Sequence, residues 1–391
     1  MPYQKTLFVI CFLTIILICF LKCSNHSSSS NDPRGGLYAG SQTCISCHKN
    51  IADSYFHNNH FKTSGKASYS ALKNLIDSAN STINFINNQK IVLTEKDTSF
   101  FQSYLENNQM IRSERMDIAF GSAEKAQTFA YWNNHQLFQL PLTYLTSSNT
   151  WTNSPGFPID KPYFTRVIPS RCLECHTSYV KVTEEREGTL LKVDEKFDPN
   201  TIIFGIDCER CHGPAEKHVQ FHQENPDFKT AKFITSIKSL SRQQQVDLCG
   251  TCHSGNPVTL NSIFAFTPGD TLSKYYLFYS AGKIDPDVHG MQLQSLQLSK
   301  CYQQSMMTCM TCHEPHQSVK DNQIMINKCV SCHTQSEHAI QMKTEKQNCI
   351  SCHMPLRPSR SLDFNNETQG NNIPYMLRTH RIAIYKTSEI K

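Results

Sequence analysis

The chain has 391 residues, of which 18 are cysteine and 17 are histidine, and its formal net charge is +5. With 39 % hydrophobic and 18 % charged residues, the composition excludes an intrinsically disordered chain. A dense disulfide scaffold is also excluded, because such scaffolds are mostly shorter than about 100 residues.

Residues 1–23 have the pattern of a targeting segment. The apolar run from Leu7 to Leu21 is shorter than the roughly 20 residues that a membrane span needs. It therefore favours an export signal, with a slightly short, uncleaved membrane anchor as the alternative. We expect an exported protein of the periplasm or cell envelope, held at a membrane by this segment or by a lipid.

Cys23 is the candidate for lipidation, because it ends the apolar run ahead of a serine-rich stretch. Lys22 departs from the small residue usual before a lipoprotein cysteine, so lipid anchor, plain anchor and soluble export all stay open. Residues 24–36 are expected to form a flexible linker.

Residues 37–80 are expected to form a first haem segment around the first copy of a repeated pattern, Cys-x-x-Cys-His. Scattered cysteine and histidine would give roughly 0.04 copies in a chain of this length. The chain has seven, numbered here motif 1 to motif 7 in chain order, and ending at His48, His176, His212, His253, His313, His333 and His353.

The pattern is the attachment signature of c-type haem. The two sulfurs of each motif add to the haem vinyl groups, and the following histidine then lies under the iron as its proximal ligand. An isolated copy could instead be half of a zinc site or a redox pair, but seven copies favour seven covalently attached haems. The attachment cysteines are then Cys44, Cys47, Cys172, Cys175, Cys208, Cys211, Cys249, Cys252, Cys309, Cys312, Cys329, Cys332, Cys349 and Cys352.

Residues 81–170 are expected to hold a small antiparallel β-subdomain inserted between motif 1 and motif 2. Short apolar–polar alternations fill residues 82–148, and Asn87-Asn88 and Asn133-Asn134 separate such runs as hairpin turns would.

Residues 171–391 are expected to form a six-haem domain of short helices and loops. Helices are predicted near 213–225, 239–250 and 290–306, and the tail after Asn366 is expected to be loop until Pro374 and then a short segment that carries His380. The fold class predicted for the whole chain is therefore mainly α-helical with much loop, folded around stacked haems.

Distal iron ligands decide whether a haem carries electrons or binds a substrate. A haem with histidine on both faces is saturated, whereas an open face can accept a small molecule. Ten histidines lie outside the motifs. Six of them are favoured as distal ligands: His60, His218, His289, His316, His338 and His380. Because there are seven irons, either one of the less favoured histidines is the seventh ligand or at least one iron is open.

The charge balance does not predict a nucleic-acid partner. Seven haems would add about 14 propionates and seven ferric irons, which brings the net charge to about −2. We expect no nucleic acid, but redox proteins as partners and a membrane contact through the N-terminal segment.

Several stretches around the motifs resemble the multihaem cytochromes c related to hydroxylamine oxidoreductase and to the tetrahaem cytochrome that accepts its electrons. The resemblance covers most of residues 37–385. Its clearest stretches are YAGSQTC at 38–44, GIDCERCHGPAEKHV at 205–219, HGMQLQSLQLSKCYQQSMMTCMTCHEPH at 289–316, CISCHMP at 349–355 and THRI at 379–382.

The resemblance implies a mainly α-helical, haem-stacked fold and a respiratory redox role. It also implies distal ligation by His60, His218, His289, His316 and His380. The chain departs from its relatives in lacking a Cys-x-x-Cys-Lys motif and an eighth haem motif.

Two functions remain open at this point. The first is an electron carrier, in which closely packed haems form a conducting path. The second is an oxidoreductase acting on a small nitrogen or sulfur species such as nitrite, hydroxylamine, sulfite or tetrathionate. It would need an open iron and nearby donors, for which Tyr163, Arg166 and Arg171 beside motif 2 are weak catalytic candidates.

Overall fold

The computed structural model describes residues 31–76, 81–186, 194–278, 285–318, 321–333, 348–366 and 371–386. The expected targeting segment with Cys23, most of the linker, and His338 lie outside the described residues. Within the described ranges, no helix is both long and apolar enough to cross a membrane.

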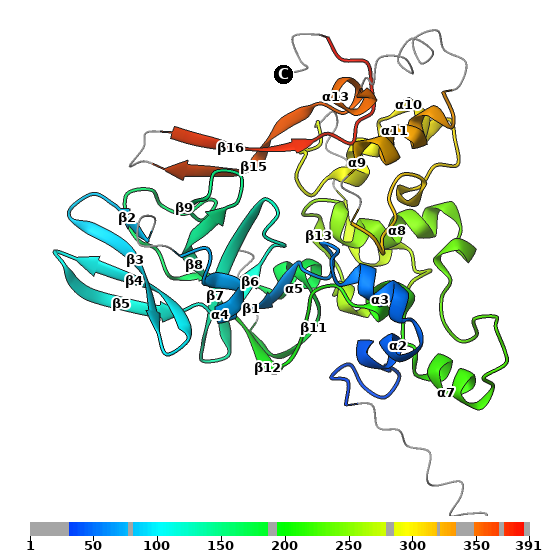
Figure 1. The fold of residues 1–391 in the computed structure, drawn as a ribbon, viewed down its shortest axis with the longest axis horizontal. Coiled ribbons are helices and arrows are strands. Elements are labelled where there is room, and N and C mark those ends of the chain that lie inside the picture. Colours follow the sequence, from blue (N-terminus) through cyan, green and yellow to red (C-terminus); the bar gives the residue numbers. More distant parts are fainter. Residues whose placement is uncertain are drawn as a thin grey trace, which may run out of the picture.

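Two antiparallel sheets occupy one side of the molecule (Figure 1). The four-stranded sheet has the order β2-β3-β4-β5, with β2 Thr82–Asn84, β3 Gln89–Lys96, β4 Ser99–Glu106 and β5 Gln109–Arg115. The six-stranded sheet has the order β1-β6-β7-β8-β10, with β9 paired to β8. Its strands are β1 Ser64–Lys66, β6 Ile118–Phe120, β7 Ala126–Asn133, β8 Gln136–Leu145, β9 Thr150–Asn153 and β10 Arg166–Val167.

Two-residue turns set the register of these strands. Asn87 and Asn88 have φ of 57° and 56°, the left-handed pair that a tight hairpin of right-twisted strands requires. The second predicted turn lies one residue further along, at Asn134 and His135, with φ of 48° and 65°. Asparagine tolerates this conformation better than most residues, which is why these turns were visible in the sequence.

The two sheets share one apolar core. Phe100 of β4, Phe129 of β7 and Trp151 of β9 are at most 2 % exposed and belong to the same packed cluster. The Gln102 side chain joins the sheets, because its amide donates to the Leu142 carbonyl (3.0 Å) and accepts from the Leu142 N–H (2.8 Å). The strands of this region therefore form a sandwich with its own core.

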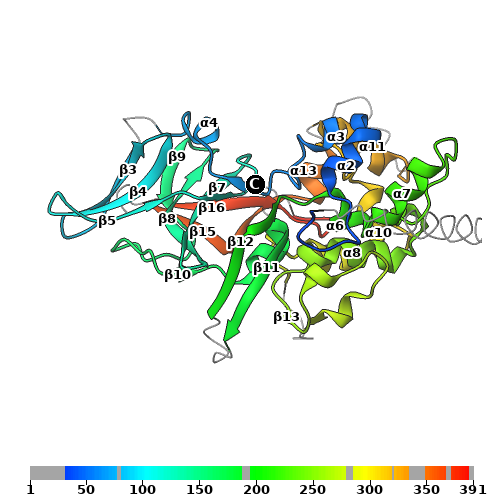
Figure 2. The ribbon, with the colours of Figure 1, turned by 90° about the horizontal axis from the view of Figure 1, so that it is seen from below.

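Short helices and turns carry the motifs on the other side of the molecule (Figures 1 and 2). The α-helices there are α2 Ser41–Cys47, α3 Lys49–Tyr55, α5 Ser170–His176, α6 Cys208–His212, α7 Glu216–Glu224, α8 Arg242–His253, α9 Gln292–Gln297, α10 Lys300–Gln303, α11 Asn322–Val330 and α13 Cys349–His353. In the described part of the chain, four 3₁₀ turns join them: η1 Ile237–Ser239, η2 Ile263–Ala265, η3 Leu272–Lys274 and η4 Cys309–Thr311. A further helix, α4 Tyr69–Leu72, packs beside the sheets.

The expectation of a mainly α-helical fold is wrong. The structure is about 28 % helix and 30 % strand, so strands outweigh helices. Besides the two sheets, a hairpin of β11 Thr177–Arg186 and β12 Asp194–Phe204 follows motif 2, and a short pair joins β13 Val258–Thr259 to β14 Tyr276–Leu277. A further hairpin pairs β15 Leu356–Asn366 with β16 Asn371–Arg378, so residues 371–373, which were expected to be loop, belong to a strand.

Tertiary contacts explain why the last hairpin escaped prediction. The buried carboxylate of Asp287 accepts the N–H groups of Arg360 (3.0 Å) and Ser361 (2.8 Å) in β15. The hairpin then runs from α13 towards β9, which it contacts (Figure 2). Its strands are thus held by groups far away in the sequence rather than by their own alternation.

Candidate haem sites

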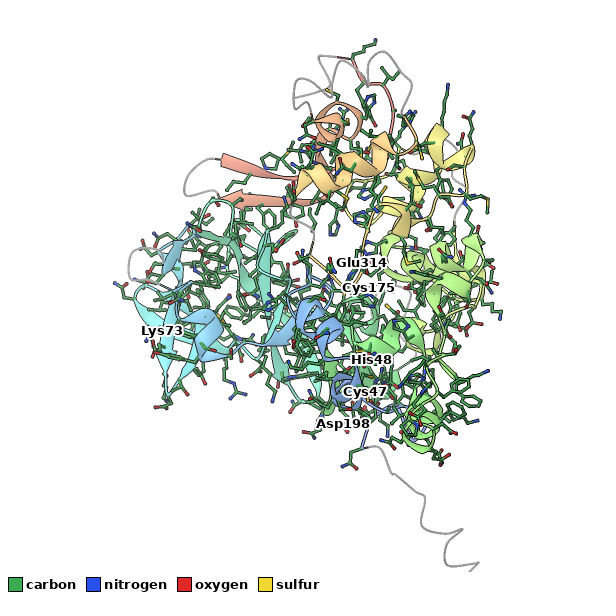
Figure 3. The ribbon with its side chains drawn as sticks, turned by 45° about the vertical axis from the view of Figure 1, so that its right-hand side comes forward. Cys47, His48, Lys73, Cys175, Asp198 and Glu314 are labelled. Carbon is green, nitrogen blue, oxygen red and sulfur yellow. The ribbon has the colours of Figure 1, made fainter. Side chains whose placement is uncertain are left out.

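Each motif forms one turn of helix or a turn at a helix end. Motifs 2, 3, 4 and 7 lie within α5, α6, α8 and α13, and motif 1 ends α2. Residues three and four apart lie on one face of a helix, so both cysteines and the histidine of a motif point the same way. Figure 3 shows Cys47 and His48 of motif 1 in the same half of the molecule as Cys175 of motif 2, with Lys73 among the strands.

Four motif histidines lie opposite a second imidazole. The ring centres of His48 and His218 are 6.4 Å apart, those of His212 and His316 6.0 Å, those of His253 and His60 6.1 Å, and those of His313 and His380 6.2 Å. The structure thus places four of the six predicted distal histidines, from separate segments, facing motifs 1, 3, 4 and 5.

These separations fit a haem iron between the rings. A nitrogen that ligates a metal lies about 2 Å from it, and the ring centre lies roughly 1 Å farther out. Two imidazoles on opposite faces of one iron therefore have ring centres about 6 Å apart. The ring planes are within 25° of parallel in three pairs, whereas those of His60 and His253 meet at 84°.

Hydrogen bonds to backbone carbonyls orient several of the imidazoles for ligation. The Nδ1 of His218 donates to the Lys232 carbonyl (2.8 Å), that of His212 to the Thr235 carbonyl (3.0 Å), and that of His353 to the Ala383 carbonyl (2.9 Å). A carbonyl only accepts, so it fixes the proton on Nδ1 and leaves the Nε2 lone pair for a metal.

The protein around the rings keeps them neutral. Burial lowers the pKa of His60 and of His380 to about 4, because the charged imidazolium loses its hydration. Burial also lowers the pKa of His176, His212 and His313. Neutral imidazole is the form that binds a metal, so these sites are prepared for iron at neutral pH.

Cysteine contacts connect the motifs in space in an order that differs from the chain order. The thiols of Cys44 and Cys208 are hydrogen-bonded to each other, as are those of Cys175 and Cys252 and those of Cys249 and Cys309. These contacts join motif 1 to motif 3, motif 2 to motif 4, and motif 4 to motif 5. Longer-range electrostatic interactions relate Cys211 to Cys252, Cys312 to Cys332, and Cys329 to Cys349.

These interactions link motifs 1, 3, 4, 5, 6 and 7 in that order. Motif 2 adjoins motif 4 through Cys175 and Cys252, and it adjoins motif 3 through the Arg210 side chain, which donates to the Glu174 carbonyl (3.3 Å). Element contacts agree, because α2 touches α6, α5 and η4 touch α8, and α11 touches α13. Motif 4 is therefore the junction of the arrangement.

Motif 2 has different surroundings. The ring of His176 stands edge-on to Phe120 of β6 at 5.7 Å, and its Nδ1 is hydrogen-bonded to the Thr63 hydroxyl (3.1 Å). His289, a predicted distal ligand, lies close enough to lower the pKa of His176, after burial as the main cause. The His289 ring contacts Tyr375 of β16 (6.2 Å), and its Nδ1 lies 3.4 Å from the Ser361 hydroxyl.

The weak catalytic candidates lie around the first cysteine of motif 2. Arg166 and Arg171 both interact electrostatically with Cys172, and Arg166 does so with Tyr163 as well. Arg166 also donates to the carbonyls of Pro155 (2.7 Å) and Gly156 (2.8 Å), and Tyr163 packs edge-on against Phe157. Arg171 donates to the Cys175 sulfur (3.0 Å), and its buried Nε has no partner. An orphaned buried guanidinium nitrogen beside an attachment cysteine is what a haem propionate would satisfy.

The histidine pairings and one ion cluster could not be found from the sequence. Arg34, 6 % exposed, binds Asp32 (2.8 Å), Asp207 (2.7 Å) and Glu209 (3.0 Å). The cluster ties the segment before motif 1 to motif 3, because Glu209 is one of the two spacer residues of that motif. No spacing in the sequence signals such a contact.

None of the described cysteines, which include every motif cysteine and Cys301, is in a disulfide, so the motif sulfurs are available for attachment. In the same described ranges, no group of three or more histidine, cysteine or acidic side chains is arranged to hold a metal ion directly.

Three similarities to known proteins accompany this geometry. A family described as cytochrome c554 and c-prime matches residues 160–213, which contain motifs 2 and 3. The multihaem cytochrome MtrA of Shewanella baltica is 27 % identical over 166 residues, which are 39 % of this chain and 47 % of that protein. The chain thus matches about half the length of this relative.

The crystal structure of the outer cell wall cytochrome OcwA shares the fold, with a TM-score of 0.50 and 15 % identity over 88 % of this chain and 79 % of that one. Together with the seven motifs, these similarities support a multihaem c-type cytochrome with covalently attached haem c.

Proposed function

We propose that this chain is an exported, membrane-tethered cytochrome with seven haems that carries electrons between redox partners in respiration. We also propose that it is related to the hydroxylamine oxidoreductase group through the motif-flanking stretches quoted above. The observation that carries the electron-transfer function is the set of four facing imidazole pairs, supported by the cysteine contacts between motifs 1 and 3 and between motifs 4 and 5.

In this proposal the haems supply the one-electron chemistry, and the residues of the chain hold, orient and space them. Histidine on both faces leaves no open position, so such a site exchanges electrons without binding a substrate. Carbonyls behind the imidazoles fix the rings, which reduces the structural change on oxidation and reduction.

Neighbouring histidines on α7 provide a matched test of this assignment. We expect His218→Ala to convert the haem of motif 1 from low-spin to high-spin, because His218 faces His48. His222→Ala, one helical turn away, should leave every haem low-spin, although the two rings are only 4.6 Å apart. The ferric EPR spectrum distinguishes the two results, and a high-spin signal from His222→Ala alone would reverse the assignment.

A second candidate function is small-molecule chemistry at motif 2. The ring contact found for His176 is to Phe120 rather than to a facing imidazole. If this haem is open, the untreated ferric protein has a high-spin signal that cyanide or nitrite removes, and Cys172→Ser with Cys175→Ser abolishes it. A fully low-spin spectrum unchanged by either ligand would exclude this function.

A further inference from the structure

We propose that residues 226–239 form the docking surface through which an acidic electron-transfer partner reaches the haem of motif 1. This inference rests on the proposed function, because it needs a haem at motif 1. It adds where the partner binds and what chemistry the partner presents.

The segment lies directly against ligands of two neighbouring motifs. It begins after α7, which carries His218 opposite His48. Its Lys232 carbonyl accepts from His218, and its Thr235 carbonyl accepts from His212 of motif 3. A partner that covers this segment is therefore brought next to motif 1, an end of the path through the motifs.

Two aromatic side chains of the segment are exposed to solvent. Phe228 is 42 % exposed and Phe233 is 60 % exposed, and both stand edge-on to Phe221 of α7, at 5.2 Å and 5.5 Å. Phe233 has φ of 57°, a left-handed conformation that is unfavourable for a bulky residue. Backbone strain of this kind clusters at functional positions, and exposed aromatics are enriched in protein interfaces.

The charge of the segment defines the partner. Residues 226–239 contain three exposed lysines, Lys229, Lys232 and Lys238, and one exposed acidic residue, Asp227, so the segment is basic overall. The Lys232 ammonium lies 5.7 Å from the centre of the Phe228 ring, so charge and apolar surface belong to one patch. A basic rim around aromatic contacts complements an acidic surface and accelerates association with it.

The test uses a gold electrode coated with a carboxylate-terminated monolayer as the acidic surface, and the haem-loaded full chain. We expect Lys229→Glu with Lys232→Glu and Lys238→Glu to slow interfacial electron transfer at least about tenfold at low ionic strength and to abolish its salt dependence. The matched control, Lys66→Glu with Lys96→Glu and Lys125→Glu, makes the same charge change at exposed lysines of the sandwich side and should leave the rate unchanged.

A second variant tests the aromatic contribution. Phe233→Asn suits the left-handed backbone while removing the ring, so it should keep the fold and reduce the amount of protein adsorbed on the monolayer. Equal rates for the two triple variants would overturn the proposal. The proposal would also be overturned if the charge reversal changed binding to phosphatidylglycerol vesicles but left the electron-transfer rate at the electrode unchanged. The segment would then bind a membrane rather than an acidic protein.

The solution redox titration separates this inference from the proposed function. Seven haems that titrate normally, with no effect of the charge reversal at the electrode, would overturn only the docking surface. A protein without haem would overturn both.

Discussion

Arg34→Ala is expected to lower the free energy of unfolding by about 3–5 kcal/mol, because it leaves three buried carboxylates without their cation. The Arg34 side chain is 6 % exposed, and those of Asp207 and Glu209 are 4 % and 1 % exposed. Glu209 also accepts the N–H groups of Ala39, Gly40 and Ala215, so it cannot turn away. Denaturant unfolding followed by the haem absorbance measures the loss.

The pH dependence of this variant has a definite sign. Burial is the main cause that raises the pKa of Glu209 above its usual value, so the folded state binds this proton more readily than the unfolded chain. Without the Arg34 cation, which lowers this pKa, the pKa of Glu209 rises further. The stability deficit should therefore be largest at neutral pH and should shrink as pH falls through the raised pKa of Glu209.

An exposed ion pair supplies the control. Lys49 lies 2.8 Å from Asp53, with side chains 73 % and 55 % exposed. Solvent screens such a pair, so Lys49→Ala should cost at most about 1 kcal/mol. A loss for Arg34→Ala no larger than that for Lys49→Ala would contradict the structural role of the buried cluster.

Removal of the haem at motif 4 is expected to slow electron transfer along the path more than removal of the haem at motif 2. Motif 4 interacts with motifs 2, 3 and 5, so Cys249→Ser with Cys252→Ser should leave only the longer routes from motif 3, through His316 to motif 5 and through Arg210 to motif 2. Cys172→Ser with Cys175→Ser should leave the sequence of motifs 1, 3, 4 and 5 intact. Electron tunnelling slows exponentially with distance, so the two double variants should differ strongly in the rate of electron transfer along the path.

Film voltammetry measures this difference. Lys229→Cys in a Cys301→Ser background attaches the protein to gold beside motif 1. At high scan rate the motif 4 variant should pass less charge than the motif 2 variant, because transfer beyond the haems of motifs 1 and 3 is slowed, whereas the motif 2 variant should lose a single haem. Equal charge passed by the two variants would show that the contacts between cysteines do not define the path.

The sequence predicted the local features and missed the distant ones. Asn87-Asn88 and the helix around motif 4 could be predicted because turn chemistry and helical spacing are encoded within a few residues. The β15–β16 hairpin could not, since Asp287 holds it from outside. The family resemblance also favours helices, so the sequence predicts loop and helix where β11–β12 forms, although Val180 and Val182 alternate with polar residues there.

The same difference between local and distant features applies to the candidate haem sites. A motif is local, so the attachment residues could be proposed from spacing alone. Pairing is not local, because His60 faces a motif almost two hundred residues further along the chain. The sequence could name His60, His218, His316 and His380 as candidates, but only the fold assigns a partner to each. The carbonyls of Lys232 and Thr235 have no sequence signal, because every residue has a carbonyl.

Intact-mass spectrometry of the denatured protein, matured in a host that attaches haem, tests the central claim most directly. Covalent attachment survives denaturation, so the mass should equal that of the polypeptide plus seven haems. A mass without haem, or with fewer than seven in fully matured protein, would contradict the seven-haem conductor.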